Sequence, residues 1–356
     1  MKVDYNILAN FFDYDELYLE FDRVINNINT IDMEYGIDII FKYYRKTGFP
    51  HYQISETEKH NHVKKMINFN VDTIFKDDVI VQTMHGLRLA WSYFPHFWEV
   101  KCGNTKTAPI DNYIDDDLFK TAIKKTWQWE LKHWGGGVSG YKFHENRLRQ
   151  ALKISNTQAV SNFRPTAAKV IYENYGGDGV IWDMSCGWGG RLLGFLSSPR
   201  AKHYIGTEPS SKTFDGLLKI KEDFSYLNKK IEIHKLGSEV FRPKQETLDL
   251  CFTSPPYFDT EKYSDEGTQS YIKFPSSDEW LDGFLRKTIE NCYYGLKKGG
   301  YMLINIANTP KYKFIEKGTI DISAEMGFVH ETTLQLTLSS ISGNGYKYEP
   351  IFVFKK

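Results

Sequence analysis

The sequence predicts an α/β fold: a seven-stranded, mostly parallel sheet in residues 156–356, preceded by an aromatic-rich, mostly helical region in residues 1–155. After residue 155, short apolar runs alternate with segments of helical periodicity, which is the pattern of a parallel sheet with helices on both faces. A glycine-rich turn follows the first run, and a Ser-Gly-Asn-Gly turn at residues 342–345 separates the last two. The second turn indicates an antiparallel hairpin at the end of the sheet.

The expected elements follow one another regularly in the second part of the chain. Parallel strands are expected at residues 180–182, 203–206, 231–234, 247–252 and 301–306, and the hairpin strands at 329–338 and 350–354. Helices are expected in the stretches that end at residues 197 and 227, and over residues 280–296, where apolar residues recur at helical spacing. The Gly-Gly pair at residues 299–300 is expected to end the last helix.

The first part of the chain is less regular. Helices are expected at residues 118–131 and 144–154, separated by a loop at 135–140 because four glycines in six residues cannot hold an element. The first forty residues are acidic, whereas residues 116–153 are rich in lysine and arginine. We therefore expect residues 1–155 to form an accessory region, distinct from the sheet domain at 156–356.

The composition excludes several classes of protein. The 45 basic and 45 acidic residues of the 356 give a net charge of zero, which argues against binding nucleic acid by bulk charge. No apolar run reaches the ~20 residues that span a bilayer, and the acidic first twenty residues do not resemble a signal peptide. Four cysteines are too few for a disulfide scaffold and too dispersed for a metal site. We expect free thiols, no metal and a cytoplasmic location.

A glycine-rich turn between the first expected strand and its helix is the first candidate ligand site. Glycines there let a ligand approach the backbone, and the turn lies at the carboxyl end of the sheet, where open α/β folds bind ligands. Glu208 stands about twenty residues beyond the turn, where a ribose-binding acid is found in dinucleotide-type folds. Ser238 and Glu239 follow the third strand, where polar side chains can meet an adenine.

The fourth expected strand leads directly into Thr253-Ser254-Pro255-Pro256-Tyr257. Proline fixes φ at about −65° and has no N–H, so this loop offers mainly hydrogen-bond acceptors, including the Ser254 hydroxyl. The exocyclic amine of adenine or cytosine presents two N–H donors and a poorly nucleophilic lone pair. Two acceptors can hold such an amine and favour a more tetrahedral nitrogen, while Tyr257 can stack on the base.

These two motifs carry a resemblance to a known family. Asp183-x-x-x-Gly187-x-Gly189 followed by Glu208 resembles the cofactor-binding half of Rossmann-like S-adenosylmethionine-dependent methyltransferases. The TSPPY loop resembles the catalytic loop of amino-methyltransferases that methylate N6 of adenine or N4 of cytosine in DNA. The segments 162–168 and 348–354 resemble the family's methionine-binding segment and last strand, and 258–264 with 269–270 resembles the variant of phage-encoded members.

The resemblance, which spans residues 160–356, implies a Rossmann-like methyltransferase fold, S-adenosyl-L-methionine as cofactor and a set of site residues. In such enzymes the acid of the first motif lies near the cationic methionine amine, whereas it would repel a pyrophosphate, which argues against NAD. The implied cofactor-binding residues are Phe163, Arg164, Pro165, Thr166, Asp183, Ser185, Gly187, Gly189, Glu208, Ser238, Glu239 and Thr253, and the implied catalytic residues are Ser254, Pro255, Pro256 and Tyr257. Ser254 is commoner in cytosine-N4 enzymes than in adenine enzymes, which favours cytosine without deciding the base.

The expected partner is DNA, with RNA, a protein partner and a homodimer left open. The target base would be flipped from the duplex, because the loop cannot reach a stacked base. We expect Tyr257, Phe258 and Tyr263 to contact the base. No long recognition domain follows the catalytic loop, so recognition is expected from residues 1–155, from 259–275 or from a partner. In the basic stretch we expect Lys142, Arg147 and Arg149 to hold phosphates among aromatic residues such as Trp129 and Trp134.

Other activities were weighed against this interpretation. Related loops methylate guanine N2 in RNA or glutamine amides in proteins, and a non-catalytic nucleic-acid-binding module is a third alternative. Cytosine-C5 chemistry is excluded because it needs a cysteine nucleophile in the catalytic loop, and Cys251 precedes that loop. His60-Asn61-His62 is interpreted as part of a surface helix and not as a nuclease motif. The recognition sequence and a role in restriction, protection or regulation stay open.

Overall fold

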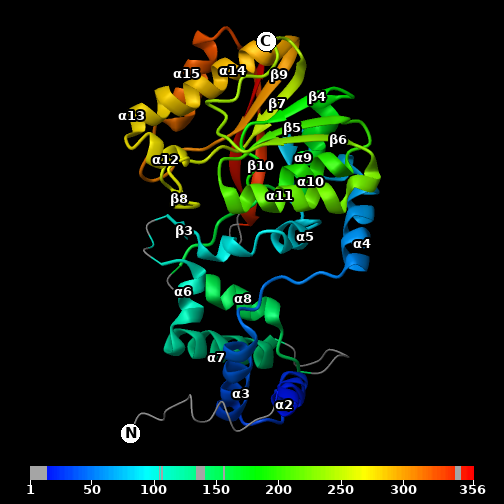
Figure 1. Cartoon of the computed structure of the whole chain (residues 1–356), viewed down its shortest axis with the longest axis vertical. Coiled ribbons are helices and arrows are strands. Elements are labelled where there is room, and N and C mark those ends of the chain that lie inside the picture. Colours follow the sequence, from blue (N-terminus) through cyan, green and yellow to red (C-terminus); the bar gives the residue numbers. More distant parts are fainter. Residues whose placement is uncertain (1–13, 104, 106, 134–140, 155–156, 341–345) are drawn as a thin grey trace. The chain divides into compact units, whose positions relative to one another are not determined.

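The computed structural model describes residues 14–103, 105, 107–133, 141–154, 157–340 and 346–356. The chain forms two compact units, one from residues 1–51 and 98–160 and the other from residues 52–97 and 161–356 (Figure 1). The expected single boundary at 155/156, whose two residues lie outside the described ones, is therefore too simple. The chain crosses between the units three times, and the segment 52–97 packs with the sheet.

The large unit contains a sheet of nine strands in the described residues, in the order β1-β2-β10-β11-β9-β7-β4-β5-β6. These strands are β1 (Phe75–Lys76), β2 (Val79–Ile80), β4 (Val180–Asp183), β5 (His203–Thr207), β6 (Lys230–His234), β7 (Leu248–Thr253), β9 (Leu296–Asn305), β10 (Val329–Ser340) and β11 (Tyr346–Lys355). The five expected parallel strands and the closing antiparallel pair are confirmed, with β11 inserted between β9 and β10. The turn expected at 342–345 lies outside the described residues.

Parallel pairing at the centre of the sheet follows from strands that are apolar on both faces. Trp182 on β4 is in register with Ile205 on β5 and with Cys251 on β7. All four cysteines of the chain are buried free thiols. Helices cover both faces (Figure 1). On one side are α9 (Pro165–Ile171), α10 (Gly190–Ser197) and α11 (Ser211–Asp223), and on the other α13 (Ser277–Trp280), α14 (Lys287–Gly295) and α15 (Ile315–Glu325). The 3-10 turn η4 (Ser225–Leu227) follows α11, and β8 (Glu261–Lys262) and α12 (Ser270–Lys273) follow β7.

The helix expected over residues 280–296 is interrupted. A π-helical turn, η5 (Leu281–Arg286), lies between α13 and α14, and a second, η3 (Tyr172–Gly176), ends α9. A Cβ on Gly283 would come within 2.2 Å of the Phe274 ring, so the chain needs glycine where this turn passes the aromatic side chain. β9 then begins at Leu296, before the expected 301.

The segment 52–97 adds two strands at one edge of the sheet, which the sequence did not predict. Its elements are α4 (Glu56–Ile67), η1 (Val71–Thr73), β1, β2 and α5 (Leu87–Ser92), with η2 (Pro95–Glu99) at its end. Strand β2 pairs parallel with β10, where the Gln335 amide donates to the Asp78 carbonyl at 2.8 Å. This pairing covers an edge of the sheet that would otherwise present unpaired backbone groups. Strands of two residues are too short to show an alternating pattern.

The smaller unit is helical around its own core. It contains α2 (Tyr14–Asn26), α3 (Met33–Thr47), β3 (Lys101–Cys102), α6 (Pro109–Ile114), α7 (Asp116–His133) and α8 (Glu145–Ile154). Val24, Ile40, Phe119, Trp127 and Leu148 are fully buried there. The expected helices at 118–131 and 144–154 are confirmed by α7 and α8, whereas the glycine-rich loop at 135–140 lies outside the described residues.

Candidate active site

The glycine-rich turn runs from the end of β4 to the start of α10. Gly187 and Gly189 have φ of 54° and 70°, which is the left-handed region that favours glycine. A Cβ on Gly189 would lie 2.6 Å from the Ile220 side chain, and one on Gly190 would lie 1.9 Å from the carbonyl oxygen of Phe163. Glycine is therefore needed both for the shape of the turn and for the close approach of the segment that precedes α9.

Asp183, the last residue of β4, is completely buried. Arg191 Nε donates to both of its carboxylate oxygens at 3.1 and 2.9 Å, and the Tyr204 hydroxyl donates to Oδ2 at 2.7 Å. The Ser185 amide and the Thr253 hydroxyl donate to Oδ1, each at 3.3 Å. These donors match the four lone-pair sites of a carboxylate. Asp183 therefore holds the turn in place, and its charge is already balanced by the protein's own guanidinium.

Arg191 completes this arrangement from the first turn of α10. Its guanidinium also donates to the carbonyl of Ser185, inside the glycine-rich turn. Burial by itself lowers the pKa of Arg191, and the neighbouring Asp183 carboxylate more than offsets this, so that the pKa is raised. The sequence analysis did not select Arg191, although an arginine directly after the glycines of such a turn is a visible feature.

Glu208 follows β5 directly and closes the other side of the turn. Its carboxylate accepts hydrogen bonds from the Gly187 amide at 3.0 Å and the Ser210 amide at 2.9 Å. Burial raises the pKa of Glu208 to about 7, although both backbone donors lower it. The residue predicted to bind a ribose therefore lies against the glycine-rich turn, as the order of the motifs implies.

The segment before α9 supplies a half-buried cation, Arg164. Pro165 is the first residue of that helix, and Thr166 is tied to the Thr83 hydroxyl at 2.8 Å. The Arg164 Nε atom is buried, with no hydrogen-bond partner among the described residues, and burial lowers the pKa of Arg164. The ring of Phe163 lies edge-on to Phe252 at 5.2 Å. The Nη1 atom of Arg164 donates a long hydrogen bond to the carbonyl of Asn162, at 3.5 Å. A buried donor without a partner is costly unless an acceptor meets it, so the Nε atom makes this segment fit a ligand that carries a carboxylate.

The side chains of Ser238 and Glu239 both contact other side chains of the protein. The Ser238 side chain is buried and its hydroxyl lies 2.7 Å from that of Thr288 on α14. Glu239 forms an ion pair with Lys273 at 2.6 Å. Both side chains therefore have partners within the protein, Ser238 on α14 and Glu239 on α12. The sequence positions of the two residues could not reveal these contacts.

The TSPPY loop starts where β7 ends, beside the glycine-rich turn. The Thr253 hydroxyl donates to Asp183, whereas Tyr257 points toward the other neighbouring strands. The Tyr257 hydroxyl donates to Glu349 Oε1 on β11 at 2.8 Å, and Asn305 Nδ2 on β9 donates to the second oxygen of Glu349 at 3.3 Å. Burial, and then the Glu349 carboxylate, raise the pKa of Tyr257. Ser254 and Pro256 are half-buried and Pro255 is buried.

Sequence analysis missed Asn305 and the role of Glu349. Asn305 is the last residue of β9, and Glu349 belongs to the terminal segment that resembles the family's last strand. Both positions were visible as polar residues at strand positions, but their pairing with Tyr257 depends on β11 lying between β9 and β10.

The two residues after the loop have different environments. Phe258 has φ of 54° and is 5% exposed, with its ring 5.0 Å from that of Tyr312 and 6.1 Å from that of Trp280. It belongs to the core under α13–α15, so the prediction that it contacts the base is corrected. Tyr263 donates to Glu261, and its ring lies 5.9 Å from that of Trp188 in the glycine-rich turn.

The segment 52–97 also contributes to this part of the large unit. The rings of Phe94 and His96 lie 5.8 and 5.2 Å from that of Trp188. Trp188 is therefore held between aromatic side chains from far apart in the chain, and this packing explains why residues 52–97 belong with the sheet.

The basic residues chosen from residues 116–153 lie in the smaller unit. Arg149 is 4% exposed, and its guanidinium donates to the carbonyl of Pro50, to Glu145 at 3.1 Å and to Asn146. Its prediction as a phosphate ligand is corrected, because a buried arginine with these partners holds the unit together. Arg147 stacks on Trp129 at 3.4 Å, and Lys142 is half-buried. Trp134 lies outside the described residues.

Two further observations concern the described residues as a set. They contain no group of three or more histidine, cysteine, aspartate or glutamate residues placed to hold a metal ion. Within the same residues, none of the helices is both long enough and apolar enough to cross a membrane.

Known proteins were compared with the chain. A family model described as DNA methylase matches residues 248–356, from β7 through the TSPPY loop to the end of β11. No curated protein sequence matches the chain.

Solved structures with a similar chain path include several methyltransferases. A SAM-dependent methyltransferase from Methanosarcina mazei is 15% identical, covers 52% of this chain and 96% of its own, and has a TM-score of 0.37. A methyltransferase from Pyrococcus furiosus is 13% identical over 54% of this chain and 82% of its own, with a TM-score of 0.38. A TehB-like SAM-dependent methyltransferase from Corynebacterium glutamicum is 16% identical over 60% and 95%, with a TM-score of 0.36.

The family match covers one of the two loops at this edge of the sheet. The matched residues include the whole TSPPY loop, Asn305 and Glu349. Next to this loop lies a glycine-rich turn with an acid at the following strand end, which is the arrangement expected for an S-adenosylmethionine site. A family model described as DNA methylase thus matches the segment of the chain that holds the TSPPY loop, Asn305 and Glu349.

Proposed function

We propose that this protein is an S-adenosyl-L-methionine-dependent methyltransferase and that it transfers a methyl group to the exocyclic amine of a DNA base, N4 of cytosine or N6 of adenine. The observation that carries the proposal is the hydrogen bond from the Thr253 hydroxyl to Asp183 Oδ1 at 3.3 Å. It joins the first residue of the TSPPY loop to the acid that precedes the glycine-rich turn. Because β4 and β7 are parallel neighbours, both loops leave the same edge of the sheet.

The residues around the glycine-rich turn fit the cofactor. Arg164, whose buried Nε lacks a partner among the described residues, would hold the carboxylate of its methionine part. Glu208 would accept hydrogen bonds from its ribose hydroxyls, and the open backbone at Gly187 and Gly189 would let it approach closely. When bound, S-adenosyl-L-methionine supplies an electrophilic methyl group on a sulfonium. Asp183 would act through the turn that it holds.

The TSPPY loop would hold the amine that receives the methyl group. The Ser254 hydroxyl and the carbonyls of the loop are acceptors for its two N–H groups, and neither proline offers a competing N–H donor. Tyr257 would stack on a base that has left the duplex. These residues would work by positioning, and the proton can leave after transfer, when the nitrogen has become acidic, so no strong base is needed.

The choice of target base and the contacts to the DNA backbone are also part of this proposal. Ser254 favours cytosine over adenine as the target. Lys142 and Arg147 of the smaller unit remain proposed contacts to DNA phosphates, and Arg149 is withdrawn from that set. A cytoplasmic location, a protein partner and a homodimer remain predictions from the sequence.

The test is to incubate the protein with labelled cofactor and varied DNAs and to analyse the nucleosides by mass spectrometry. N4-methylcytosine or N6-methyladenine is expected, and the absence of both would contradict the proposal. Label in RNA or in protein alone would select the guanine-N2 or amide alternative. Failure to bind the cofactor in calorimetry would favour a non-catalytic module. Tyr257→Ala and Pro255→Ala should abolish the product and leave cofactor binding nearly intact.

A further inference from the structure

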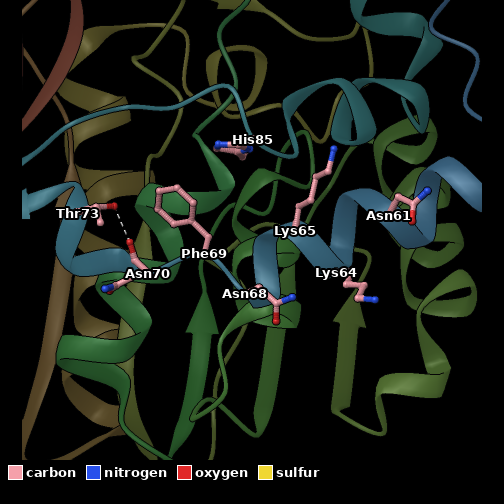
Figure 2. Close-up of a pocket in the computed structure, with 8 residues that line it drawn as sticks. All are labelled: Asn61, Lys64, Lys65, Asn68, Phe69, Asn70, Thr73 and His85. Carbon is pink, nitrogen blue, oxygen red and sulfur yellow. Dashed lines mark hydrogen bonds between the residues drawn. The ribbon is translucent and has the colours of Figure 1, made fainter.

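A pocket lies on the large unit, around the end of α4. It has a volume of about 540 Å³ and is lined by Asn61, Lys64, Lys65, Asn68, Phe69, Asn70, Thr73 and His85. In the view of Figure 2 the Phe69 ring lies between the Asn70–Thr73 pair and Lys65, and His85 lies above, between Phe69 and Lys65. The volume is within the range of ~300–1,000 Å³ usual for ligand sites. Nothing in the methyl-transfer site described above uses these residues.

The lining combines positive charge, amides and one aromatic ring. None of the eight lining residues, all within the described part of the chain, is acidic. Lys64, Lys65 and His85 are exposed, whereas Phe69 is half-buried with its ring 5.2 Å from that of His85. Next to the pocket, burial and then Arg88 and Lys65 lower the pKa of His62, as expected where cations gather. The chemistry therefore suits a ligand with negative charge and a flat apolar part.

The end of a helix normally disfavours an anion, because its free carbonyls carry partial negative charge. Here the buried Lys169 side chain offsets the partial negative charge of these carbonyls. Its ammonium donates to the carbonyls of Met66, Ile67 and Phe69 at 3.0, 2.9 and 2.8 Å. The carbonyls at the end of α4 thus accept hydrogen bonds from a buried ammonium group. On the exposed side, the side chains of Lys64 and Lys65 make the local charge positive.

The pocket lies close to the edge of the sheet that carries the cofactor loop. The Thr83 hydroxyl is 2.8 Å from that of Thr166. A Cβ on Gly86, next to His85, would come 3.1 Å from the Pro165 side chain. Pro165 and Thr166 begin α9 immediately after Arg164. The chain on either side of His85, a lining residue, therefore contacts the segment proposed to hold the cofactor.

We propose that this pocket is an accessory binding site for a nucleic-acid strand, in which Lys64, Lys65 and His85 hold phosphates and Phe69 stacks on a base. Phosphates meet the lysines and the histidine, the amides of Asn68 and Asn70 offer further donors, and a ring face accepts any base. The inference rests on the proposed function for its substrate: it gives the catalytic unit its own contact with DNA outside the target base.

The test measures binding of a fluorescent single-stranded oligothymidylate to the full chain by anisotropy, without cofactor, at several salt concentrations. Lys64→Ala with Lys65→Ala should weaken binding about tenfold. It should also reduce the slope of log K against log salt by about 1.4, since each phosphate contact on a single strand contributes roughly 0.7. The matched control replaces the exposed Lys298 and Lys317 of the same unit, and its affinity should stay within about twofold of the wild type.

Variants of Phe69 distinguish binding of a nucleic-acid strand from binding of a simple anion. Phe69→Ala should weaken binding of the oligothymidylate about fivefold or more, and leave binding of an abasic strand of equal length unchanged. Phe69→Trp should restore the affinity, which a variant that merely misfolds would not show. Equal loss on both strands, or displacement of both by inorganic phosphate alone, would reduce the pocket to an anion site and overturn the proposal.

The two proposals fail in different ways. If Lys64→Ala with Lys65→Ala binds like the control pair while the wild type methylates DNA, the pocket proposal is wrong and the proposed function stands. If the pocket variants lose affinity while nucleoside analysis finds no methylated base, the accessory site is supported and the proposed methyl transfer is contradicted.

Discussion

The hydroxyl of Tyr257 donates to the carboxylate of Glu349 at 2.8 Å, across 92 residues of sequence. Asn305 holds the second oxygen of the same carboxylate at 3.3 Å and donates to the carbonyl of Pro350 at 3.0 Å. Tyr257, the aromatic residue of the TSPPY loop, is therefore fixed at its far end by two neighbouring strands. Its ring is positioned by the sheet and not by the loop alone.

The first prediction concerns this anchor. Tyr257→Phe keeps the ring but removes the hydroxyl, and Glu349→Ala removes the acceptor. A hydrogen bond to a charged group contributes ~1.5–3 kcal/mol, so each change should lower kcat about 10–100-fold with little change in cofactor affinity. The double variant should be no slower than the slower single variant, since both remove one interaction. Glu349→Gln, which retains an acceptor oxygen, is the control and should recover most of the rate.

The second prediction tests the partner of Arg164. Arg164→Met should weaken binding of S-adenosyl-L-methionine by about 10–100-fold, because the charge-assisted hydrogen bonds to its carboxylate are lost. 5′-Methylthioadenosine has no carboxylate, so its affinity should not change. Calorimetry with both compounds measures the difference. Equal loss for the two would show that Arg164 shapes the site without contacting the carboxylate.

The third prediction concerns stability. Arg191→Met leaves the buried Asp183 carboxylate without its counter-charge, which costs about 3–5 kcal/mol for a buried pair. Urea unfolding should show a loss of this size. Arg200, exposed and bonded to the Glu173 carbonyl, is the matched control, and Arg200→Met should change the unfolding free energy by less than about 0.5 kcal/mol. Adding Asp183→Asn to Arg191→Met should recover part of the loss, because no charge then stays buried.

The fourth prediction is a pH dependence centred on Glu208. Burial raises the pKa of Glu208 to about 7 from its ordinary value of 4.5. The amides of Gly187 and Ser210 already donate to its two oxygens, so protonation would remove acceptor capacity that the ribose hydroxyls need. Cofactor affinity should therefore fall below about pH 7, by up to about tenfold per pH unit, and Glu208→Gln should remove this dependence.

The same group affects folding in the opposite sense. Between pH 4.5 and about 7 the folded state holds a proton on Glu208 that the unfolded state has released. The contribution of Glu208 to stability must therefore decrease as pH rises through this window. Thermal unfolding of the Glu208→Gln variant and the wild type, compared at both ends of the window, measures it. A wild-type stability that rises more steeply than that of the variant would contradict this sign.

Much of the sheet could be predicted because its causes are local. A buried parallel strand is an apolar run, and glycine and proline impose their backbone limits wherever they stand. The strands from Val180 to Thr253, the glycine-rich turn and the TSPPY loop were located in this way. Phe258 and Arg149 were misjudged because an aromatic or basic residue near a motif looks the same whether it faces a ligand or the core.

The sequence by itself determined the order of strands along the chain, the two loops that leave one edge of the sheet, and the class of chemistry that those loops favour. Only the tertiary structure decided which residues support them. Arg191 neutralises Asp183, Glu349 anchors Tyr257, and residues 52–97 join the sheet and build a pocket at its side. These relationships depend on contacts between distant residues, which no local pattern records, because burial and pairing are properties of the assembled fold.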